Sequence, residues 1–349
     1  MEILQRLADI FGPLGAILTF ATGLTTALGY FVSRGAAAIS AVLSVVAISV
    51  FVFITYGPGL SSDGGGQAVS DDAEVAQVVP TRFEGITKFH RDCPDCPELT
   101  YVRPAVGIEG AANTDHEGLP DERPQHVVRI PKGYWIGRDE VTVSEFSSFI
   151  AQSGYAMAPG CRVKSEGIWH NDPGAGWQAP GFPQDTTSPV VCVSYTDAAA
   201  YTRWLSGKTG RQYRLPTESE WEVAARAGSR DRYISGATLD ASSANVISGG
   251  NSPAGTVAVG RYAPNALGMY DVAGNAWEWT RDCGTDDYTS APRDGTADIS
   301  GNCDRRVTRG GAFANPANQA RFAKRSRDTA DYRFFDVGFR VAADASETE

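Results

Sequence analysis

Residues 264–279 read Pro264-Asn-Ala-Leu-Gly-Met-Tyr-Asp-Val-Ala-Gly-Asn-Ala-Trp-Glu-Trp279, and this stretch says most about the fold. Proline, asparagine and glycine recur in it, and these residues form turns rather than long helices or strands. Trp277 and Trp279 each combine a large apolar ring with one N–H group, as core anchors do. A carboxylate between two such rings, here Glu278, needs a cation, a hydrogen-bond donor or a proton. The stretch therefore predicts a turn-rich core with a partnered acid inside it.

The sequence on either side of this stretch predicts three helices, over residues 143–153, 196–209 and 217–227. Apolar residues recur in them at helical spacing. The third helix has the clearest start, because Thr217 and Glu220 have the spacing of a capping box and follow a proline. These helices are short, so most of the chain must adopt other structure.

Short strands joined by turns account for much of the remainder. The clearest candidates cover residues 127–130, 190–194, 257–259 and 337–341. These strands do not alternate regularly with helices as they would around a parallel sheet. The chain also contains 38 glycines, which favours loops. The predicted fold class is therefore an irregular, loop-rich α+β domain.

The net charge of the 349-residue chain is -10, which bears on the partner. Nucleic-acid binding needs a clustered positive field, so the sequence argues against DNA or RNA. A Gly-x-Ser-x-Gly nucleophile elbow is absent, and the four histidines lack the i, i+4 spacing of a helical metal pair. Composition and simple motifs therefore point to no particular catalysis.

The first 60 residues predict a membrane anchor. No charged residue occurs over residues 10–33 or 35–62, and Arg34 separates the two runs. Each run is long enough to cross a hydrocarbon core, which needs about 20 apolar residues. The second run is the more apolar, whereas the first contains Pro13 and is either a second span or an interfacial helix. We therefore expect one or two transmembrane helices.

Charge also predicts the topology. Arg34 facing the cytoplasm places the C-terminal domain outside, and Arg6 gives the same result if only the second run spans. We expect an inner-membrane protein with its folded domain in the periplasm or extracellular space. A cleaved signal peptide is the competing interpretation, but the apolar stretch is longer than its usual core of about 7–15 residues. Residues 61–82 are rich in Gly, Ser, Asp and Ala and predict a flexible linker.

Six cysteines, all after the membrane segment, favour disulfides formed outside the cytoplasm. Cys161 and Cys192 flank one loop-rich excursion, and Cys283 and Cys303 flank another, so a bridge across each would restrain it. Zinc is the weaker interpretation, because only Cys93 and Cys96 are closely spaced. A local bridge between those two would be strained and open to redox chemistry.

Four segments together resemble the sulfatase-modifying-factor, or formylglycine-generating-enzyme, family, over about 260 residues and in the family's order. The segments are Gly133-Tyr-Trp-Ile-Gly-Arg-Asp-Glu-Val-Thr142, Pro189-Val-Val-Cys-Val-Ser-Tyr-Thr-Asp-Ala198 with Arg214-Leu-Pro-Thr-Glu-Ser-Glu-Trp-Glu222, residues 264–279, and Arg309-Gly-Gly311 with Gly338-Phe-Arg-Val341. The resemblance implies an irregular, C-type-lectin-like domain over residues 83–349, with bound calcium.

The resemblance also implies which residues hold that calcium. It makes Asn275 and Glu278 ligands of one ion, and hard oxygen ligands of this kind suit calcium. A second site is implied at Asn245 and Val246, but Asn251 stands near the position of its acid. From the residues alone, Glu278 has another interpretation, as a buried glutamate paired with an arginine.

The enzyme's own chemistry is not expected here. In the family, two cysteines after the Arg-Gly-Gly motif hold a copper ion as thiolates, the soft ligands that copper(I) prefers. Their positions in this chain are Asn315 and Ala320, and neither supplies a thiolate. The resemblance therefore argues against copper and against formylglycine generation by the copper mechanism.

The segment 315–336 corresponds to the family's substrate groove and is locally basic. The candidate groove residues are Asn315, Asn318, Arg321, Arg325 and Arg327. We interpret them as a binding surface for an anionic or peptide ligand, with a solvated loop face as the alternative. The expected function is a non-catalytic binding or assembly subunit of a membrane complex, with a protein partner. The alternative is an oxidoreductase or maturation factor with altered chemistry, acting on an exported protein or metabolite.

Overall fold

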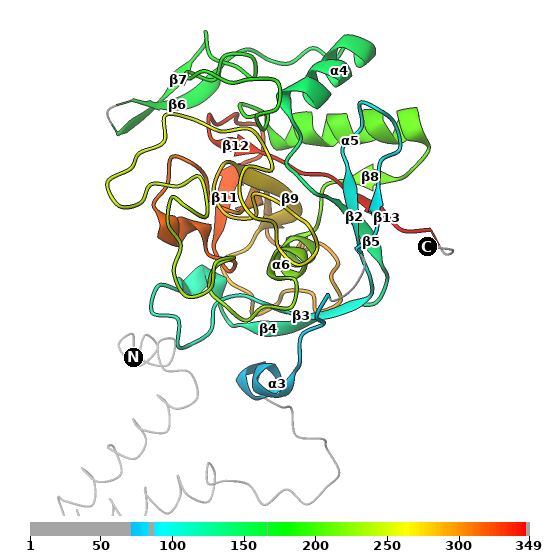
Figure 1. Ribbon diagram of the computed structural model, residues 1–349, viewed down its shortest axis with the longest axis vertical. Helices are drawn as coiled ribbons and strands as arrows, with labels where there is room; N and C mark the ends of the chain where they lie inside the picture. The colour runs from blue at the N-terminus through cyan, green and yellow to red at the C-terminus, as the bar shows by residue number, and fades with distance from the viewer. Residues whose placement is uncertain (1–70, 84–86, 166, 347–349) are drawn as a thin grey trace, which may run out of the picture. The chain divides into compact units, whose positions relative to one another are not determined.

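The computed structural model describes residues 71–83, 87–165 and 167–346 (Figure 1). The predicted membrane anchor, residues 1–60, and residues 61–70 of the predicted linker lie outside the described residues. Within the described ranges, no helix has both the length and the apolar character needed to cross a membrane.

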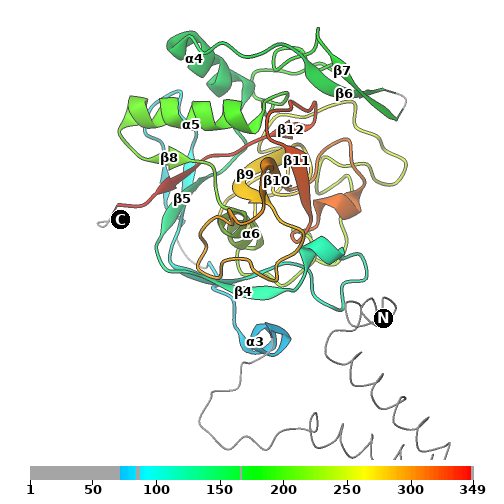
Figure 2. The same cartoon turned by 180° about the vertical axis from the view of Figure 1, so that it is seen from behind.

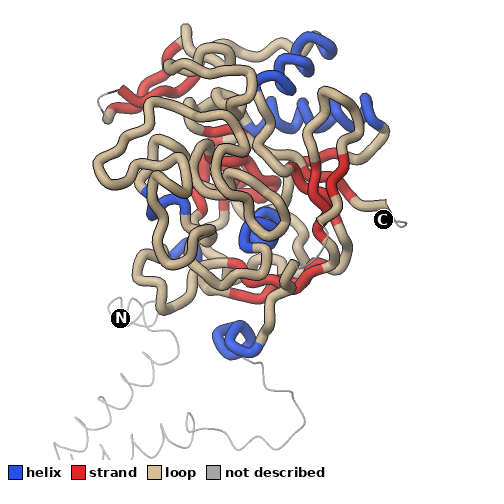
Figure 3. Tube along the Cα trace, in the orientation of Figure 1, coloured by secondary structure: helices blue, strands red, loops and turns tan. Residues whose placement is uncertain are grey.

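Regular elements are short and separated by long loops, as the tan segments of Figure 3 show. The helices of the described part are α3 (Asp71–Gln77), α4 (Val143–Ser153), α5 (Tyr195–Thr209) and α6 (Glu218–Arg226), with 3-10 turns at Pro120–Glu122 and Ala317–Ala320. Its strands are β1 (Phe89–His90), β2 (Leu99–Val102), β3 (Ala105–Glu109), β4 (His126–Ile130), β5 (Tyr134–Gly137), β6 (Cys161–Ser165), β7 (Ile168–Asp172), β8 (Tyr213–Arg214), β9 (Trp277–Gly284), β10 (Asn302–Arg309), β11 (Arg325–Thr329), β12 (Val337–Gly338) and β13 (Ala342–Asp344). The mixed helix-and-strand class predicted from the sequence is confirmed.

Two larger sheets organise the domain. One has the strand order β1-β2-β5-β13-β8 and the other β11-β10-β9-β12, while β3-β4 and β6-β7 form separate pairs within the described residues. Strand β12 runs parallel to β9, whereas the other pairs are antiparallel. Helices α4 and α5 cover one end of the domain, and β3-β4 with α3 lie at the other (Figures 1 and 2).

The helix predictions hold because each helix begins at a capping box. Thr142, Ser194 and Thr217 each accept a hydrogen bond from the backbone three residues on, and the acid there bonds back to the cap. Helices α4 and α5 end at glycines in the left-handed conformation. Local sequence therefore fixes where these helices start and stop.

The strand predictions are only partly confirmed. Residues 127–130 lie in β4, but only Val337–Gly338 of the segment 337–341 is a strand. Residues 190–194 do not form one, because Cys192 has a φ of 58° and interrupts the extended backbone. Residues 257–259 are irregular as well, since Val257 N–H donates to the Asn275 side chain rather than to a neighbouring strand.

Residues 71–82 differ from the flexible linker that their composition predicts. Asp71–Gln77 forms α3, and the buried Val75 packs with Ile108 of β3 and Val127 of β4. An ion pair between Glu74 and Arg129 adds to this contact. One apolar side chain per turn is enough to dock a short helix onto an existing sheet, and composition alone does not reveal it.

Candidate ligand groove and buried acid cluster

A groove of about 410 Å³ lies between the β6–β7 hairpin and strand β11. Its lining includes Arg162 and Trp169 from the hairpin, Trp277 at the start of β9, Asn315, and Arg327 of β11. A backbone bridge between Arg162 and Phe334 ties the hairpin to the chain segment before β12. The hairpin is therefore a wall of the groove, and β11 forms part of the facing side.

Of the two positions that the family resemblance assigns to thiolates, one lines this groove and the other is buried. Asn315 lines it, and its Oδ1 accepts a hydrogen bond of 2.7 Å from Trp277 Nε1. Ala320 is 1% exposed and packs in a small apolar cluster with Val246 and Ala273. All six cysteines of the chain are in disulfides, so no thiol is available for copper. The pairs Cys161–Cys192 and Cys283–Cys303 are those predicted from the sequence.

Aromatic side chains form the outer rim of the groove. Trp169 meets Phe334 edge-on with ring centroids 5.9 Å apart, and Tyr332 lies 6.2 Å from the same ring. The Arg162 guanidinium lies 5.1 Å from the Tyr332 centroid, within cation–π range. Trp169 and Tyr332 remain 40% and 45% exposed, although such rings usually bury most of their surface. Their exposed faces are available to a ligand.

Two aspartates, the buried Asp336 and the partly buried Asp328, line the groove. Burial, and then the charge of Asp328, raise the pKa of Asp336 to about 7. Burial also raises the pKa of Asp328, although Thr308 Oγ1 donates to it at 2.8 Å. The groove can therefore hold or exchange a proton near neutral pH at Asp336. Arg162 presents positive charge to the groove, whereas Arg327 is paired with Asp286 at 2.7 Å.

Of the five residues predicted to line the groove, only some do so. Asn315 and Arg327 line it, whereas Asn318 is exposed elsewhere. Arg321 is 2% exposed and makes two hydrogen bonds to the Glu122 carboxylate, of 2.6 and 2.8 Å. Arg325 is equally buried and bonds Glu218 at 2.7 Å. These two arginines stabilise the interior, because each forms a buried ion pair with an acid from a distant segment of the chain.

Glu278 adopts the arginine-paired arrangement that the sequence left open. Its Oε1 accepts from Arg340 Nη2 at 2.6 Å, and its Oε2 accepts from Trp221 Nε1 at 2.7 Å as well as from Arg340 Nε. Both Glu278 and Arg340 are 0% exposed. The pair satisfies the requirement that a buried charge be matched.

The two predicted calcium sets adjoin each other. Asn245 Nδ2 donates to Asn275 Oδ1 at 3.2 Å, and Val257 N–H donates to the same oxygen at 3.0 Å. Asn275 N–H in turn bonds the Asn245 carbonyl at 3.0 Å, with the buried Val246 next in the chain. The Asn275 side-chain oxygen is thus engaged by protein donors. Asn245 and Val246 of one predicted calcium site therefore lie next to Asn275 of the other, so the two predicted sites are not separate in the structure.

Two further acids, which sequence reasoning missed, complete a cluster here. Glu140 Oε1 and Oε2 accept from Ala276 N–H and Asn275 Nδ2, and the charges of Asp271 and Glu278 add to burial in raising its pKa. Asp271 is 4% exposed, and its Oδ1 has no hydrogen-bond partner among the described residues. Burial raises the pKa of Asp271 to about 6.

The carboxylates of this cluster are ligands of the type that a hard cation prefers. Their oxygens do not all lie within 4.8 Å of one another in the described structure, so the match is one of ligand type rather than of geometry. The signal was present in the sequence, since Asp271 lies within the stretch 264–279.

Comparisons with known proteins agree with this architecture. The family model described as "Sulfatase-modifying factor enzyme 1-like domain" matches residues 94–345. A formylglycine-generating enzyme of Thermomonospora curvata is 33% identical over 313 residues, covering 73% of this chain and 98% of that enzyme. The serine/threonine-protein kinase Pkn1 of Chlamydia trachomatis is 33% identical over 257 residues, covering 71% of this chain and 39% of the kinase.

A solved structure shares the fold as well. The structure of PvdO from Pseudomonas aeruginosa superposes with a TM-score of 0.66 at 32% identity, covering 75% of this chain and all of that one. Treponema denticola variable protein 1 superposes with a TM-score of 0.56 at 23% identity.

Proposed function

This chain belongs to the sulfatase-modifying-factor family, and from that premise we propose that its folded domain binds a partner rather than catalysing the copper reaction. The proposed function is a binding or assembly subunit of a membrane protein complex. The observation that carries it is the replacement of both thiolate positions, by Asn315 and the buried Ala320, in a chain without a free cysteine. A copper site of the family's kind therefore has no soft ligands.

The proposed binding surface is the groove with its aromatic rim. Trp, Tyr and Arg supply most of the binding energy at protein interfaces, and Trp169, Tyr332 and Arg162 meet here. Strand β7 pairs only with β6 in the described part of the chain, and residues 168–171 are exposed. An extended peptide of the partner can therefore add to β7 as a further strand. The arginines favour carboxylate groups in that peptide.

The proposed location is the outer face of the inner membrane. Residues 1–60 supply the anchor in this proposal, and residues 61–70 lead to the folded domain. Disulfides are typical of proteins outside the cytoplasm, so the three bridges support export of this domain.

Co-isolation from native membranes tests the proposal. The full-length chain and a Trp169→Ala/Tyr332→Ala variant are solubilised gently, isolated, and their companions quantified by mass spectrometry. We expect a stoichiometric membrane protein with the unmodified chain and at least a tenfold loss with the variant. Ile299→Ala removes an apolar side chain that is 74% exposed outside the groove, and it should retain the partner. Recovery of the chain alone, or equal recovery with all three proteins, contradicts the proposal.

Asp336 supports the alternative of an enzyme with altered chemistry. A carboxyl group with a pKa of about 7 in a groove can act as a general acid or base. In that case the chain is an oxidoreductase or maturation factor that acts on an exported protein or metabolite. The alternative requires turnover that is lost in Asp336→Asn, or a stoichiometric transition metal in the isolated chain.

Calcium is the proposed cofactor of the buried acid cluster. Asp271 would hold it next to Asn275 and Asn245, with the unpartnered Asp271 Oδ1 as the strongest support, while Glu278 stays paired with Arg340 and Trp221. A bound divalent cation would supply positive charge to a place where burial and mutual repulsion raise the pKa values of Glu140 and Asp271. Its role would be structural.

A further inference from the structure

We propose that Cys93 and Cys96 form a thiol–disulfide exchange site, which accepts two electrons from a dithiol of a partner protein. The two cysteines are joined by a disulfide in the turn between β1 and β2. They do not belong to the lining of the groove, so this activity goes beyond the proposed binding function.

Access to the two sulfurs is unequal. Cys96 is 0% exposed and packs in the main apolar core, whereas Cys93 is only partly buried. An incoming thiolate can therefore reach Cys93 Sγ but not Cys96 Sγ. Directional attack of this kind requires one reachable and one protected sulfur.

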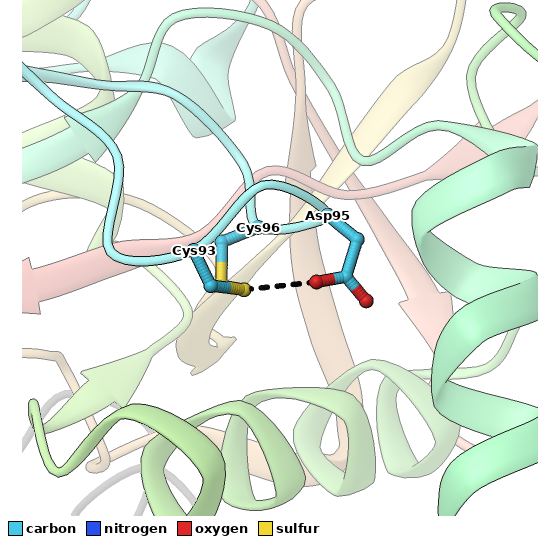
Figure 4. Close-up of side chains that lie close together, drawn as sticks. All are labelled: Cys93, Asp95 and Cys96. Carbon is cyan, nitrogen blue, oxygen red and sulfur yellow. Dashed lines mark hydrogen bonds between the residues drawn. A yellow bond between two sulfur atoms is a disulfide. The ribbon is translucent and has the colours of Figure 1, made fainter.

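Charged groups lie beside Cys93 Sγ and beside the Cys96 backbone. Asp95 Oδ1 lies 3.1 Å from Cys93 Sγ (Figure 4), and the Asp95 Oδ2 accepts from Lys208 Nζ at 2.7 Å. The bond from Lys208 lowers the pKa of Asp95, so this carboxylate stays ionised at neutral pH. Arg91 Nη1 donates to the Cys96 carbonyl at 2.7 Å, which places a positive charge near the buried cysteine. That charge favours Cys96 as the departing thiolate.

The short spacing distinguishes this pair from the other two. Its cysteines are 3 residues apart, against 31 for Cys161–Cys192 and 20 for Cys283–Cys303. A bridge that closes so short a loop restrains the unfolded chain least, so it contributes least as a structural staple. The Cys96 N–H bonds the Cys93 carbonyl at 3.0 Å, and this turn keeps the two sulfurs together after the disulfide opens.

The chemistry balances without another reactant. A substrate thiolate attacks Cys93 Sγ, a new S–S bond forms, the Cys93–Cys96 bond breaks, and its electron pair leaves on Cys96 Sγ. The second substrate thiolate then attacks the substrate sulfur of the mixed disulfide and expels Cys93. The products are a substrate disulfide and two protein thiols, which take up the two protons that the substrate released.

The test uses the full-length oxidised chain and a synthetic reduced peptide that carries two cysteines. After anaerobic incubation, the chain is unfolded in acidic denaturant, and free thiols are then alkylated and mapped by mass spectrometry. We expect one peptide disulfide per chain, with label on Cys93 and Cys96 and none on the other four cysteines. Cys93→Ser/Cys96→Ser should lower peptide oxidation at least tenfold.

The Cys283–Cys303 bridge provides the matched control, because Cys303 is exposed and Cys283 is buried. Exposure alone would therefore make it equally reactive. The Cys283→Ser/Cys303→Ser variant should oxidise the peptide as the unmodified chain does. Near-ultraviolet circular dichroism checks that both double variants are folded. Label on Cys303 in place of Cys93, or unchanged oxidation by Cys93→Ser/Cys96→Ser, overturns the proposal.

Asp95 is assigned as a positioning residue for this site. Its charge disfavours the thiolate form of reduced Cys93 and so keeps Cys93 protonated after exchange. Asp95→Asn should shift the pH profile for alkylation of reduced Cys93 downward and raise its rate at pH 7.5 severalfold, because removing the neighbouring negative charge favours the thiolate. Gln152→Ala removes a neutral contact to the same carboxylate and should leave the profile unchanged. Identical profiles for Asp95→Asn and the unmodified chain overturn this assignment.

Discussion

Arg340 shows how single residues stabilise this loop-rich core. Its guanidinium is 0% exposed and donates to Glu278 and to the carbonyls of Gly137, Arg138 and Tyr270. It thereby joins three segments that are distant in the sequence. Removing one member of a buried ion pair leaves the other charge uncompensated, which usually costs more than the pair contributes.

Arg340→Ala should therefore destabilise the domain by roughly 3–5 kcal/mol. Urea unfolding of the full-length chain, followed by tryptophan fluorescence, measures the loss. Arg129→Ala is the matched control, because its pair with Glu74 is 56% and 39% exposed and should contribute less than about 1 kcal/mol. Equal effects of the two substitutions would contradict a central role for Arg340.

Asp336 predicts a pH dependence of stability. Its pKa rises from 3.8 to about 7 on folding, so the folded protein holds a proton that the unfolded chain releases. This stabilisation is complete below pH 3.8 and is lost as the pH rises through 7. Asp336→Asn should therefore gain stability relative to the unmodified chain between pH 4 and 8, by at most on the order of 4 kcal/mol.

Urea unfolding across this pH range measures that difference. Asp185→Asn is the control, because hydrogen bonds from Thr187 lower the pKa of Asp185 and give its small effect the opposite sign. A constant stability difference between Asp336→Asn and the unmodified chain would show that Asp336 does not titrate as described.

The sequence shows that Glu278 needs a partner, because this residue stands between two tryptophans, but it does not show which partner. The structure supplies Arg340 and Trp221, which lie 62 and 57 residues away. The arginines of the segment 315–336 cannot be sorted in this way. Arg321 and Arg325 meet acids about 200 and 107 residues away, at Glu122 and Glu218, and no local pattern signals such pairs.

At the scale of elements, the β6–β7 hairpin depends on the Cys161–Cys192 disulfide. Cys161 begins β6, and both cysteines pack with Ala175 in a small buried cluster. Residues 168–171 of β7 are exposed, so the hairpin has little core of its own. The bridge and the backbone contact to Phe334 hold it beside the groove.

Cys161→Ala/Cys192→Ala should lower the free energy of unfolding by about 3–4 kcal/mol, because the bridge closes a loop of 31 residues. Denaturant unfolding gives this value, and hydrogen exchange should show faster exchange in β6 and β7. The Cys93–Cys96 bridge closes a far shorter loop, so removing it should lower the free energy of unfolding by about 2 kcal/mol. A smaller loss for the Cys161–Cys192 variant than for the Cys93–Cys96 variant would contradict this assignment.

Helices α4, α5 and α6 were predictable from the sequence, whereas the strands were predictable only in part, for a physical reason. Capping boxes at Thr142, Ser194 and Thr217 are local signals, so helix bounds follow from four consecutive residues. Strand pairing instead depends on distant partners, as in β9 with β12. The buried segment 190–194 has a strand-like sequence, yet Cys192 takes a positive φ to reach its disulfide.

At the scale of the whole molecule, calcium is expected to link segments that the sheets do not connect. Chelation with EGTA should lower the melting temperature by roughly 5–15 °C, if a saturated site contributes about 2–4 kcal/mol. Scanning calorimetry and elemental analysis of the full-length chain measure both quantities. Asp271→Asn should bind less calcium and respond less to EGTA. Absence of calcium together with an unchanged melting temperature would contradict the proposed site.

The whole domain therefore combines an intact family scaffold with an altered groove. Trp277 bonds Asn315 where the family resemblance places a thiolate, and aromatic residues with Arg162 surround that point. These features favour the proposal that the groove binds a partner. Occupation of this groove by a partner is the central prediction.

Photocrosslinking in intact membranes tests that claim most directly. A photoreactive benzoylphenylalanine is placed at Tyr332 on the groove rim, or at Ile299, which is 74% exposed outside the groove. We expect one dominant protein adduct from position 332, identified by mass spectrometry, and none from position 299. Equal adducts from both positions, or none from position 332, would contradict this prediction.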